Sequence, residues 1–291
     1  MNNVFSGFAD EAGSDLATQV RATRELGWRN IEMRNVTVPG FPSGNLHDIP
    51  DEAFHVVAGE LERAGINIHC WGSAIANGSK SIEKPFEIDL EQTKRAAARM
   101  PKIGSRFIRI MSYPILPETV DQQEVERFRR LREIQKIMDD AGVTVLHENC
   151  SNYGGMGWSY SLRLLEEVPG LKLVFDTGNC VFDRDFTRLD PAACQSTWEF
   201  YSHVRPYIVH LHIKDGVHGP QGEHIHVFPG EGTGDVRRVM IDLLATGYTG
   251  AFSIEPHLKI DAATCPAGLS LEEHRYQSYV AYGKRAMELV P

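Results

Sequence analysis

Cysteine is sparse in this sequence, and long apolar runs are missing. The five cysteines are an odd number and form no CxxC pair, which argues against a disulfide framework or a thiolate zinc site. No apolar run approaches the roughly 20 residues of a membrane span. The N-terminal sequence MNNVFSGFADEAGSDL places Asp10 and Glu11 where a signal peptide needs an apolar core. We therefore expect a cytoplasmic protein that has no contact with a membrane.

Basic residues are also too few to suggest a nucleic-acid partner. The chain has 30 Lys and Arg residues against 39 Asp and Glu residues, so its formal net charge is −9. Such a surface repels a phosphate backbone, and we expect no binding to nucleic acid. The content of 42% hydrophobic and 24% charged residues is typical of a globular protein. A homo-oligomer is compatible with this composition, which does not specify one.

Short β-rich runs alternate with amphipathic helical stretches from end to end. The expected strands are 4–9, 30–34, 66–71, 106–112, 143–148, 171–176, 207–214 and 251–255. The helices expected after them cover about 15–26, 50–64, 89–100, 123–141, 159–167, 191–204, 236–244 and 271–288. We expect Ser14 to cap the first helix, and Gly65 and Gly142 to end the second and fourth.

Eight uninterrupted β–α pairs predict a parallel sheet. In a chain of 291 residues, eight units favour closure into a (β/α)8 TIM barrel over an open doubly wound sheet. No GxGxxG motif follows the first strand, which weakens the case for a dinucleotide-binding fold. No Pro/Ser-rich linker or low-complexity stretch divides the chain, so residues 1–291 are predicted to form a single α/β domain.

Carboxylates and an imidazole gather at the ends of the last four predicted strands. Glu148, Asp176, His212 and Glu255 follow one another at a spacing of about one βα unit. Active sites of such barrels lie at the C-terminal ends of the strands, so these four side chains are expected to converge. Any one of them alone could be a solvated or capping residue. Crowded together, they need a cation or protonation, and this donor set suits Mn²⁺, Mg²⁺ or Co²⁺, with Zn²⁺ less favoured.

Other candidates lie near the ends of the earlier strands. Glu32 and Arg34 could form an ion pair with each other. His69 and Trp71 alternate onto one face of the third strand, as core packing or as an aromatic wall for a sugar ring. Arg109 lies inside an apolar strand and needs an anionic partner, which is either a protein carboxylate or the substrate.

Histidines also surround the seventh strand. His210 lies two residues before His212 and is expected to be packed behind it rather than to be a ligand. His218, His224 and His226 follow in a loop, where a polar surface explains them better than a second metal site.

The sequence resembles the sugar phosphate isomerase/epimerase group of xylose isomerase-like barrels. The resemblance covers nearly the whole chain and is carried by GFADE (7–11), HEN (147–149), FDTGN (175–179), HLHIKD (210–215), PGEG (229–232) and SIEPH (253–257). In that group a divalent metal is held by Glu, Asp, His and Glu from strands five to eight. The resemblance implies that Glu148, Asp176, His212 and Glu255 hold one metal ion, Mn²⁺ first among the candidates. It also implies that Glu148 and Glu255 move protons.

The expected reaction is proton abstraction next to a carbonyl of a small sugar or polyol, through a metal-stabilised enediolate. No Arg/Lys cluster marks a glycine-rich rim loop as a phosphate site, which favours an unphosphorylated substrate. Position near the rim predicts a set of substrate-binding residues, which comprises His147, Asn149, Asn179, Lys214, Arg109, Trp71 and Glu32.

Two departures from the family pattern leave the reaction open. Asn179 stands where some ketose epimerases have a histidine, and HIKD at 212–215 looks more like inosose dehydratases. The first alternative to isomerisation or epimerisation is therefore a dehydratase or lyase that acts on a keto-sugar, an inosose or a 3-keto-glycoside. The second is a binding barrel without catalysis, for which we expect no metal dependence.

Overall fold

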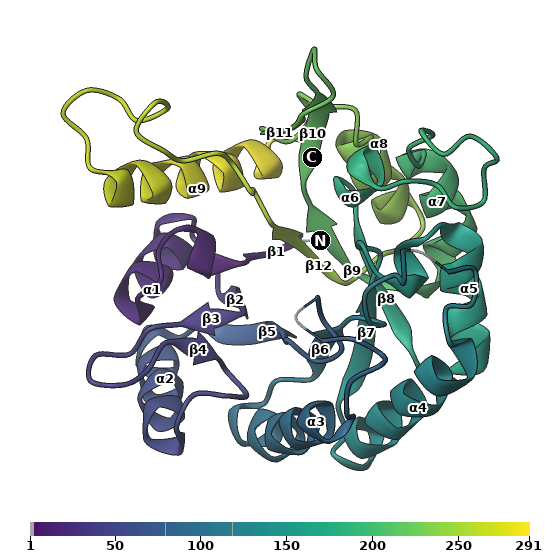
Figure 1. Cartoon of the computed structure of the whole chain (residues 1–291). Coiled ribbons are helices and arrows are strands. Elements are labelled where there is room, and N and C mark those ends of the chain that lie inside the picture. The colour runs from purple at the N-terminus through teal and green to yellow at the C-terminus, as the bar shows by residue number, and fades with distance from the viewer. Residues whose placement is uncertain (1–2, 79, 118) are drawn as a thin grey trace.

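The structure, a computed structural model, describes residues 3–78, 80–117 and 119–291. Eight parallel strands form a nearly closed barrel in the order β1-β12-β9-β8-β7-β6-β5-β2 (Figure 1). An isolated bridge between Phe8 and Glu32 joins the two ends of this sheet. The strands are β1 (Val4–Gly7), β2 (Asn30–Met33), β5 (Asn67–Gly72), β6 (Phe107–Ile110), β7 (Thr144–Glu148), β8 (Lys172–Asp176), β9 (Ile208–Ile213) and β12 (Ala251–Ile254).

A ring of helices surrounds the barrel, and α9 lies beside α1 where the ring closes (Figure 1). The helices are α1 (Leu16–Glu25), α2 (Asp51–Ala64), α3 (Glu87–Arg99), α4 (Glu124–Asp140), α5 (Trp158–Glu167), α6 (Asn179–Phe182), α7 (Thr197–Val204), α8 (Val236–Ala245) and α9 (Leu271–Met287). The predicted (β/α)8 barrel is therefore confirmed. Among the described residues, no helix has both the length and the apolar character needed to cross a membrane.

Helix ends follow local chemistry, with one correction. Gly65 and Gly142 adopt the left-handed conformation at φ 67° and 71°, as expected for glycines that end helices. The cap of α1 is Asp15 rather than Ser14, because the Asp15 carboxylate accepts a hydrogen bond of 2.9 Å from the backbone N–H of Thr18.

Some elements were not predicted from the sequence. The short helix α6 lies directly after β8, and the helix expected over 191–204 begins only at Thr197. Two hairpins are additional, β3 (Asn35–Val36) with β4 (Gly44–Asn45), and β10 (Asp215–His218) with β11 (His224–Val227). These strands are too short and too polar to show a hydrophobic period.

The register between β2 and β5 shifts after Ile31, which pairs with Ile68, because Glu32 pairs with Cys70 and leaves His69 of β5 unpaired. The ring of His69 stacks on His210 of β9, with 5.3 Å between ring centroids. Trp71, two residues later, is fully buried and packs against Phe54 of α2 at 6.0 Å. The expectation that His69 and Trp71 share a face is therefore wrong, and Trp71 belongs to the packing between sheet and helices.

Asp215 holds the loop that follows the β10–β11 hairpin. Its Oδ1 accepts hydrogen bonds from the backbone N–H groups of Gly216 and Gly234, both at 2.9 Å. Its Oδ2 accepts from Gly230 and Gly232 at 2.8 and 3.0 Å. A Cβ atom at Gly232 would lie 2.2 Å from Asp215 Oδ1, so this close approach requires glycine there.

We expect Asp215→Asn to lower the free energy of unfolding by about 3 kcal/mol, because the new amide group would face backbone donors in place of a charged acceptor. Urea denaturation measures the change. The exposed Asp190→Asn is the control and should shift stability by less than about 0.5 kcal/mol. Equal effects of the two substitutions would contradict the role given to Asp215.

Candidate metal centre

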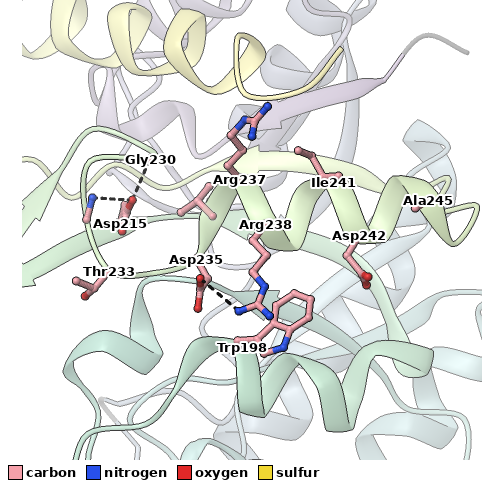
Figure 2. Close-up of a pocket in the computed structure, with 12 residues that line it drawn as sticks. Trp198, Asp215, Gly230, Thr233, Asp235, Arg237, Arg238, Ile241, Asp242 and Ala245 are labelled. Carbon is pink, nitrogen blue, oxygen red and sulfur yellow. Dashed lines mark hydrogen bonds and ion pairs between the residues drawn. The ribbon is translucent and has the colours of Figure 1, made fainter.

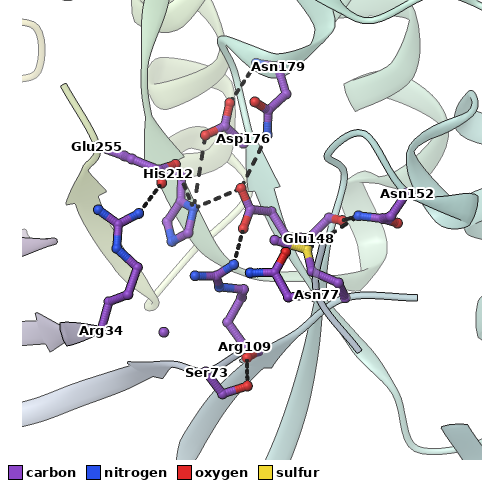
Figure 3. Close-up of polar contacts among 12 residues, drawn as sticks. Arg34, Ser73, Asn77, Arg109, Glu148, Asn152, Asp176, Asn179, His212 and Glu255 are labelled. Atoms are coloured by element: carbon purple, nitrogen blue, oxygen red, sulfur yellow. Dashed lines mark hydrogen bonds and ion pairs between the residues drawn. The ribbon is translucent and has the colours of Figure 1, made fainter. Parts of the chain in front are cut away.

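The four predicted ligands meet at the mouth of the barrel. Glu148 ends β7, Asp176 ends β8, His212 lies in β9 and Glu255 follows β12. Each offers one donor atom, and these atoms all lie within 4.8 Å of one another (Figure 3). All four side chains are buried. The strands converge in this way because parallel strands of a barrel end at the same rim.

The donor atoms surround a common point without satisfying one another. His212 Nδ1 lies 3.5 Å from Glu148 Oε1, 3.6 Å from Glu255 Oε2 and 4.0 Å from Asp176 Oδ2, longer than good hydrogen bonds. Within the described residues, Glu148 Oε2, Asp176 Oδ2 and His212 Nδ1 make no hydrogen bond although they are buried. Unsatisfied buried polar atoms are rare, and a divalent cation is a partner that suits three carboxylates and one imidazole. The residues present therefore fit such an ion.

Lys214 supplies a positive charge at the edge of this cluster. Its Nζ donates a hydrogen bond of 2.9 Å to Glu255 Oε2 and lies 3.0 Å from Asp176 Oδ2, the second contact being an ion pair without hydrogen-bond geometry. Lys214 is buried, so its ammonium group and the two carboxylates neutralise one another, and removal of either partner would leave an unpaired buried charge.

Two arginines contact the outer oxygens of the two glutamates. Arg109 Nη1 lies 3.3 Å from Glu148 Oε2, which gives Arg109 the protein carboxylate that its buried position requires. Arg34 Nη1 donates to Glu255 Oε1 at 3.2 Å, and the same guanidinium makes two hydrogen bonds to Asp10. The suggested pairing of Glu32 with Arg34 is therefore wrong.

Glu32 lies beneath the cluster instead. Its Oε2 accepts hydrogen bonds from His210 Nε2 at 2.8 Å and Ser253 Oγ at 2.6 Å, and it lies 3.1 Å from His212 Nε2. Burial alone would raise the pKa of Glu32, but the neighbouring imidazoles of His212 and His210 outweigh it and hold the pKa well below its usual range. His210 is thus packed behind His212, in the position that the sequence predicts.

Asn149 and Asn179 both hold side chains that are predicted to be ligands. Asn149 exchanges two hydrogen bonds with the backbone of Asp176, one to its carbonyl at 2.9 Å and one from its N–H at 2.7 Å. Asn179 opens α6; its N–H donates to Asp176 Oδ1 at 2.7 Å, and its amide donates to Glu148 Oε1 at 3.2 Å (Figure 3). Asn149 and Asn179, both predicted to contact the substrate, therefore have hydrogen-bond partners within the protein.

His147 precedes Glu148 in β7, so its side chain points to the other face of the sheet. It is fully buried, and its Nε2 lies 2.9 Å from Asn152 Oδ1 and 3.0 Å from Ser112 Oγ. Burial lowers the pKa of His147 to about 4. These partners anchor the loop after β7, and the structure does not bring His147 to the other rim residues.

The contact of His257 with Glu255 was not predicted from the sequence. His257 Nε2 lies 3.4 Å from Glu255 Oε1, and Nδ1 lies 2.9 Å from Glu11 Oε1. The backbone of His257 has φ 49°, and its N–H donates to Glu11 Oε2 at 2.7 Å. The GFADE and SIEPH segments could have indicated this contact, because they follow β1 and β12, which are neighbours and both end at the rim.

A separate pocket of about 650 Å³ lies outside the barrel, along α8 and beside Trp198 of α7 (Figure 2). Arg238 covers the Trp198 ring, with 3.5 Å from its Cζ to the ring centroid. Gly230 and Gly232 also line this pocket, but their N–H groups already bind Asp215. The glycine-rich loop therefore directs these amides at a carboxylate of its own chain.

A sequence model described as xylose isomerase-like TIM barrel matches residues 20–276. A search of curated proteins found no match.

Solved structures share the fold at low sequence identity. The probable 3-DHS dehydratase of petrobactin synthesis from Bacillus anthracis has a TM-score of 0.68 and 16% identity, with 98% of each chain covered. A xylose isomerase-like TIM barrel protein from Mycobacterium smegmatis in complex with magnesium has a TM-score of 0.66 and 18% identity, with coverage of 99% and 100%. The 3-keto-D-glucoside 4-epimerase from E. coli has a TM-score of 0.63 and 16% identity, with coverage of 98% and 99%.

The protonation of Asp176 predicts that metal affinity depends on pH. Burial, with the charges of Glu255 and Glu148, outweighs Lys214 and raises the pKa of Asp176 to about 7. Below that pH the carboxyl group keeps a proton that a metal must displace, and above it the proton is already gone. We expect the affinity for Mn²⁺ to fall at least about tenfold per pH unit below 7 and to change less steeply above it. Above pH 7 the proton still to be displaced is that of His212, because burial is outweighed there by Glu32 and Glu148, which raise its pKa well above the usual value. Calorimetric titration from pH 5.5 to 8 measures this, and a constant affinity below pH 7 would contradict it.

Proposed function

Since the chain belongs to the xylose isomerase-like TIM barrel family, we propose that it is a divalent-metal-dependent enzyme that isomerises or epimerises a small sugar or polyol. The observation that carries this proposal is the meeting of Glu148, Asp176, His212 and Glu255, whose donor atoms lie within 4.8 Å of one another. Three of these side chains have a buried atom that makes no hydrogen bond within the described part of the chain. Mn²⁺ is the first candidate, followed by Mg²⁺, Co²⁺ and Zn²⁺.

The metal, when bound, would polarise a substrate carbonyl and stabilise the negative charge that develops as a neighbouring C–H bond breaks. The protein supplies the proton transfers. Glu148 and Glu255 stand at the two ends of the row β7-β8-β9-β12, so they approach a bound substrate from different sides. One would remove the proton, and the other would return it on the opposite face or on the adjacent carbon.

The protonation states are suited to this role. Burial would raise the pKa of Glu148, but Arg109 and His212 outweigh it and keep the pKa below its usual value, so the carboxylate can accept a proton. Lys214 and Arg109 are the proposed contacts to substrate oxygens, because their cationic groups lie among the ligands. Asn149, Asn179 and Glu32 would act through the ligands that they hold, and His147 and Trp71 would support the barrel around them.

An unphosphorylated substrate fits the structure best. A phosphate in such barrels is commonly held by backbone amides of a glycine-rich loop near the last strands. Here the amides of Gly230, Gly232 and Gly234 are bonded to Asp215, which occupies the position that an anionic ligand would need.

Elimination of water or an aglycone is the second candidate, because it begins with the same enolising step. It is favoured by Asn179, whose amide donates to Glu148 where some ketose epimerases have a histidine. The similar solved structures include both an epimerase and a probable dehydratase, so the fold is compatible with either outcome.

Metal content tests the site itself. We expect the purified wild-type protein to hold about one Mn, Co, Mg or Zn ion per chain, and Asp176→Ala to lose it because a ligand is missing. The exposed Asp140→Ala is the control and should keep the ion. Elemental analysis of folded proteins gives the result. If neither the wild type nor its reconstituted form holds metal, a binding barrel without catalysis becomes the better interpretation.

Hydrogen exchange tests the chemistry. In D₂O, the metal-loaded protein should incorporate deuterium next to the carbonyl of a substrate found in a panel of ketoses, inososes and 3-keto-glycosides. Glu148→Gln should slow this uptake about 10²- to 10⁴-fold, because a general base is lost, whereas the exposed Glu133→Gln should not change it. Near-normal uptake in Glu148→Gln would reject the mechanism. A product of equal mass indicates isomerisation, and loss of water or an aglycone indicates elimination.

A further inference from the structure

A second polar group lies directly beneath the four proposed ligands. It comprises Glu32 of β2, His210 and His212 of β9, and Ser253 of β12, all of them fully buried. His212 belongs to both groups. One of its ring nitrogens faces the carboxylates of the metal centre, and the other faces Glu32.

The contacts of Glu32 leave little freedom for its own orientation. Ser253 Oγ donates to Oε2 at 2.6 Å, and His210 Nε2 lies 2.8 Å from the same oxygen. The proton of His210 belongs on Nε2, because Nε2 faces the carboxylate of Glu32, whereas Nδ1 has no hydrogen-bond partner within the described residues. Glu32 thus accepts hydrogen bonds from two neighbouring strands before His212 is counted.

His212 completes this set. Its Nε2 lies 3.1 and 3.2 Å from the two oxygens of Glu32. An ionised carboxylate can only accept hydrogen bonds, so the nitrogen opposite it must carry the proton. In a neutral imidazole the other nitrogen, Nδ1, then has a free lone pair, and Nδ1 is the atom that faces Glu148, Asp176 and Glu255.

We propose that Glu32 is a positioning residue that fixes the proton of His212 on Nε2 and so presents Nδ1 to the metal. The inference rests on the proposed metal-dependent function. Carboxylates that bond the outer nitrogen of a metal-ligating histidine typically improve metal affinity 10- to 100-fold. Glu32 makes this contact from β2, which lies across the junction between β1 and β2, where the barrel closes.

A second metal ion is the competing explanation, because Glu32, His210 and His212 also offer donor atoms within 4.8 Å of one another. The contacts argue against it. The oxygens of Glu32 already lie at hydrogen-bond distance from their donors, whereas the atoms of the upper cluster are 3.5 to 4.0 Å from His212 Nδ1. The carboxylate of Glu32 therefore has its hydrogen-bond donors without an ion.

Calorimetric titration with Mn²⁺ tests the proposal on the folded full-length chain. Glu32→Gln should bind Mn²⁺ about 10- to 100-fold more weakly than the wild type, with one ion per chain in both. Asp89→Asn is the matched control, because Asp89 is also buried and accepts from Ala76 N–H at 2.8 Å and Tyr113 Oη–H at 3.0 Å. It should lose stability and keep its Mn²⁺ affinity.

The possible outcomes are distinct. Equal affinity in Glu32→Gln and the wild type overturns this inference and leaves the proposed function intact. Two ions in the wild type and one in Glu32→Gln would establish the second metal instead. A wild type that binds no Mn²⁺ overturns the proposed function and this inference together.

A second measurement does not depend on the folding of Glu32→Gln. In wild-type protein with ¹⁵N-labelled histidine and bound Zn²⁺, nitrogen NMR should show the proton of His212 on Nε2. The signal is assigned by its loss in His212→Gln. A proton on Nδ1 would overturn the proposal.

Discussion

The repulsion among three buried carboxylates is the constraint on which the rest of the site depends. Glu148, Asp176 and Glu255 end three strands of one barrel, and closure of the barrel forces them together at its mouth. Their burial makes the repulsion stronger than in water. The positive charges of Lys214 and Arg109 offset part of this repulsion, and Arg34 offsets more of it through its contact with Glu255 Oε1. Among the residues that the structure describes, these cations leave buried atoms of the cluster without hydrogen bonds, which is why a further cation fits the centre.

The interior of the barrel has two polar layers that differ in completeness. In the lower layer, Glu32 receives hydrogen bonds from Ser253 and His210 and contacts His212 at hydrogen-bond distance. In the upper layer, the same histidine presents a nitrogen that lies at similar distances from three carboxylates without bonding any of them. A satisfied layer stabilises one arrangement of side chains, whereas an unsatisfied layer is prepared for a ligand. The carboxylate of Glu32 is the contact through which the first layer sets the geometry of the second.

The sequence predicted what depends on order along the chain, and it failed where contacts depend on the closed barrel. One ligand per βα unit was sufficient to place Glu148 and Asp176 at one rim, because each unit repeats the same geometry. Glu32 and His212 are 180 residues apart and meet only across the interior. Strand alternation also predicted the wrong face for Trp71, since the register shift between β2 and β5 separates that side chain from His69. Such shifts leave no periodic signal in a single sequence.

The two glutamates of the site have different surroundings, which bears on how they divide the chemistry. Burial would raise the pKa of Glu255, but Lys214, His257 and Arg34 hold it well below its usual range. At Glu148 burial is opposed by Arg109 and His212, and the pKa is lowered less. A carboxylate among several cations is a weak base and is well suited to hold a cation in place. Glu148 is therefore the better candidate to remove a proton, and Glu255 the better candidate to anchor the proposed metal. This asymmetry serves isomerisation and elimination equally, because the two reactions differ only after the first proton has left.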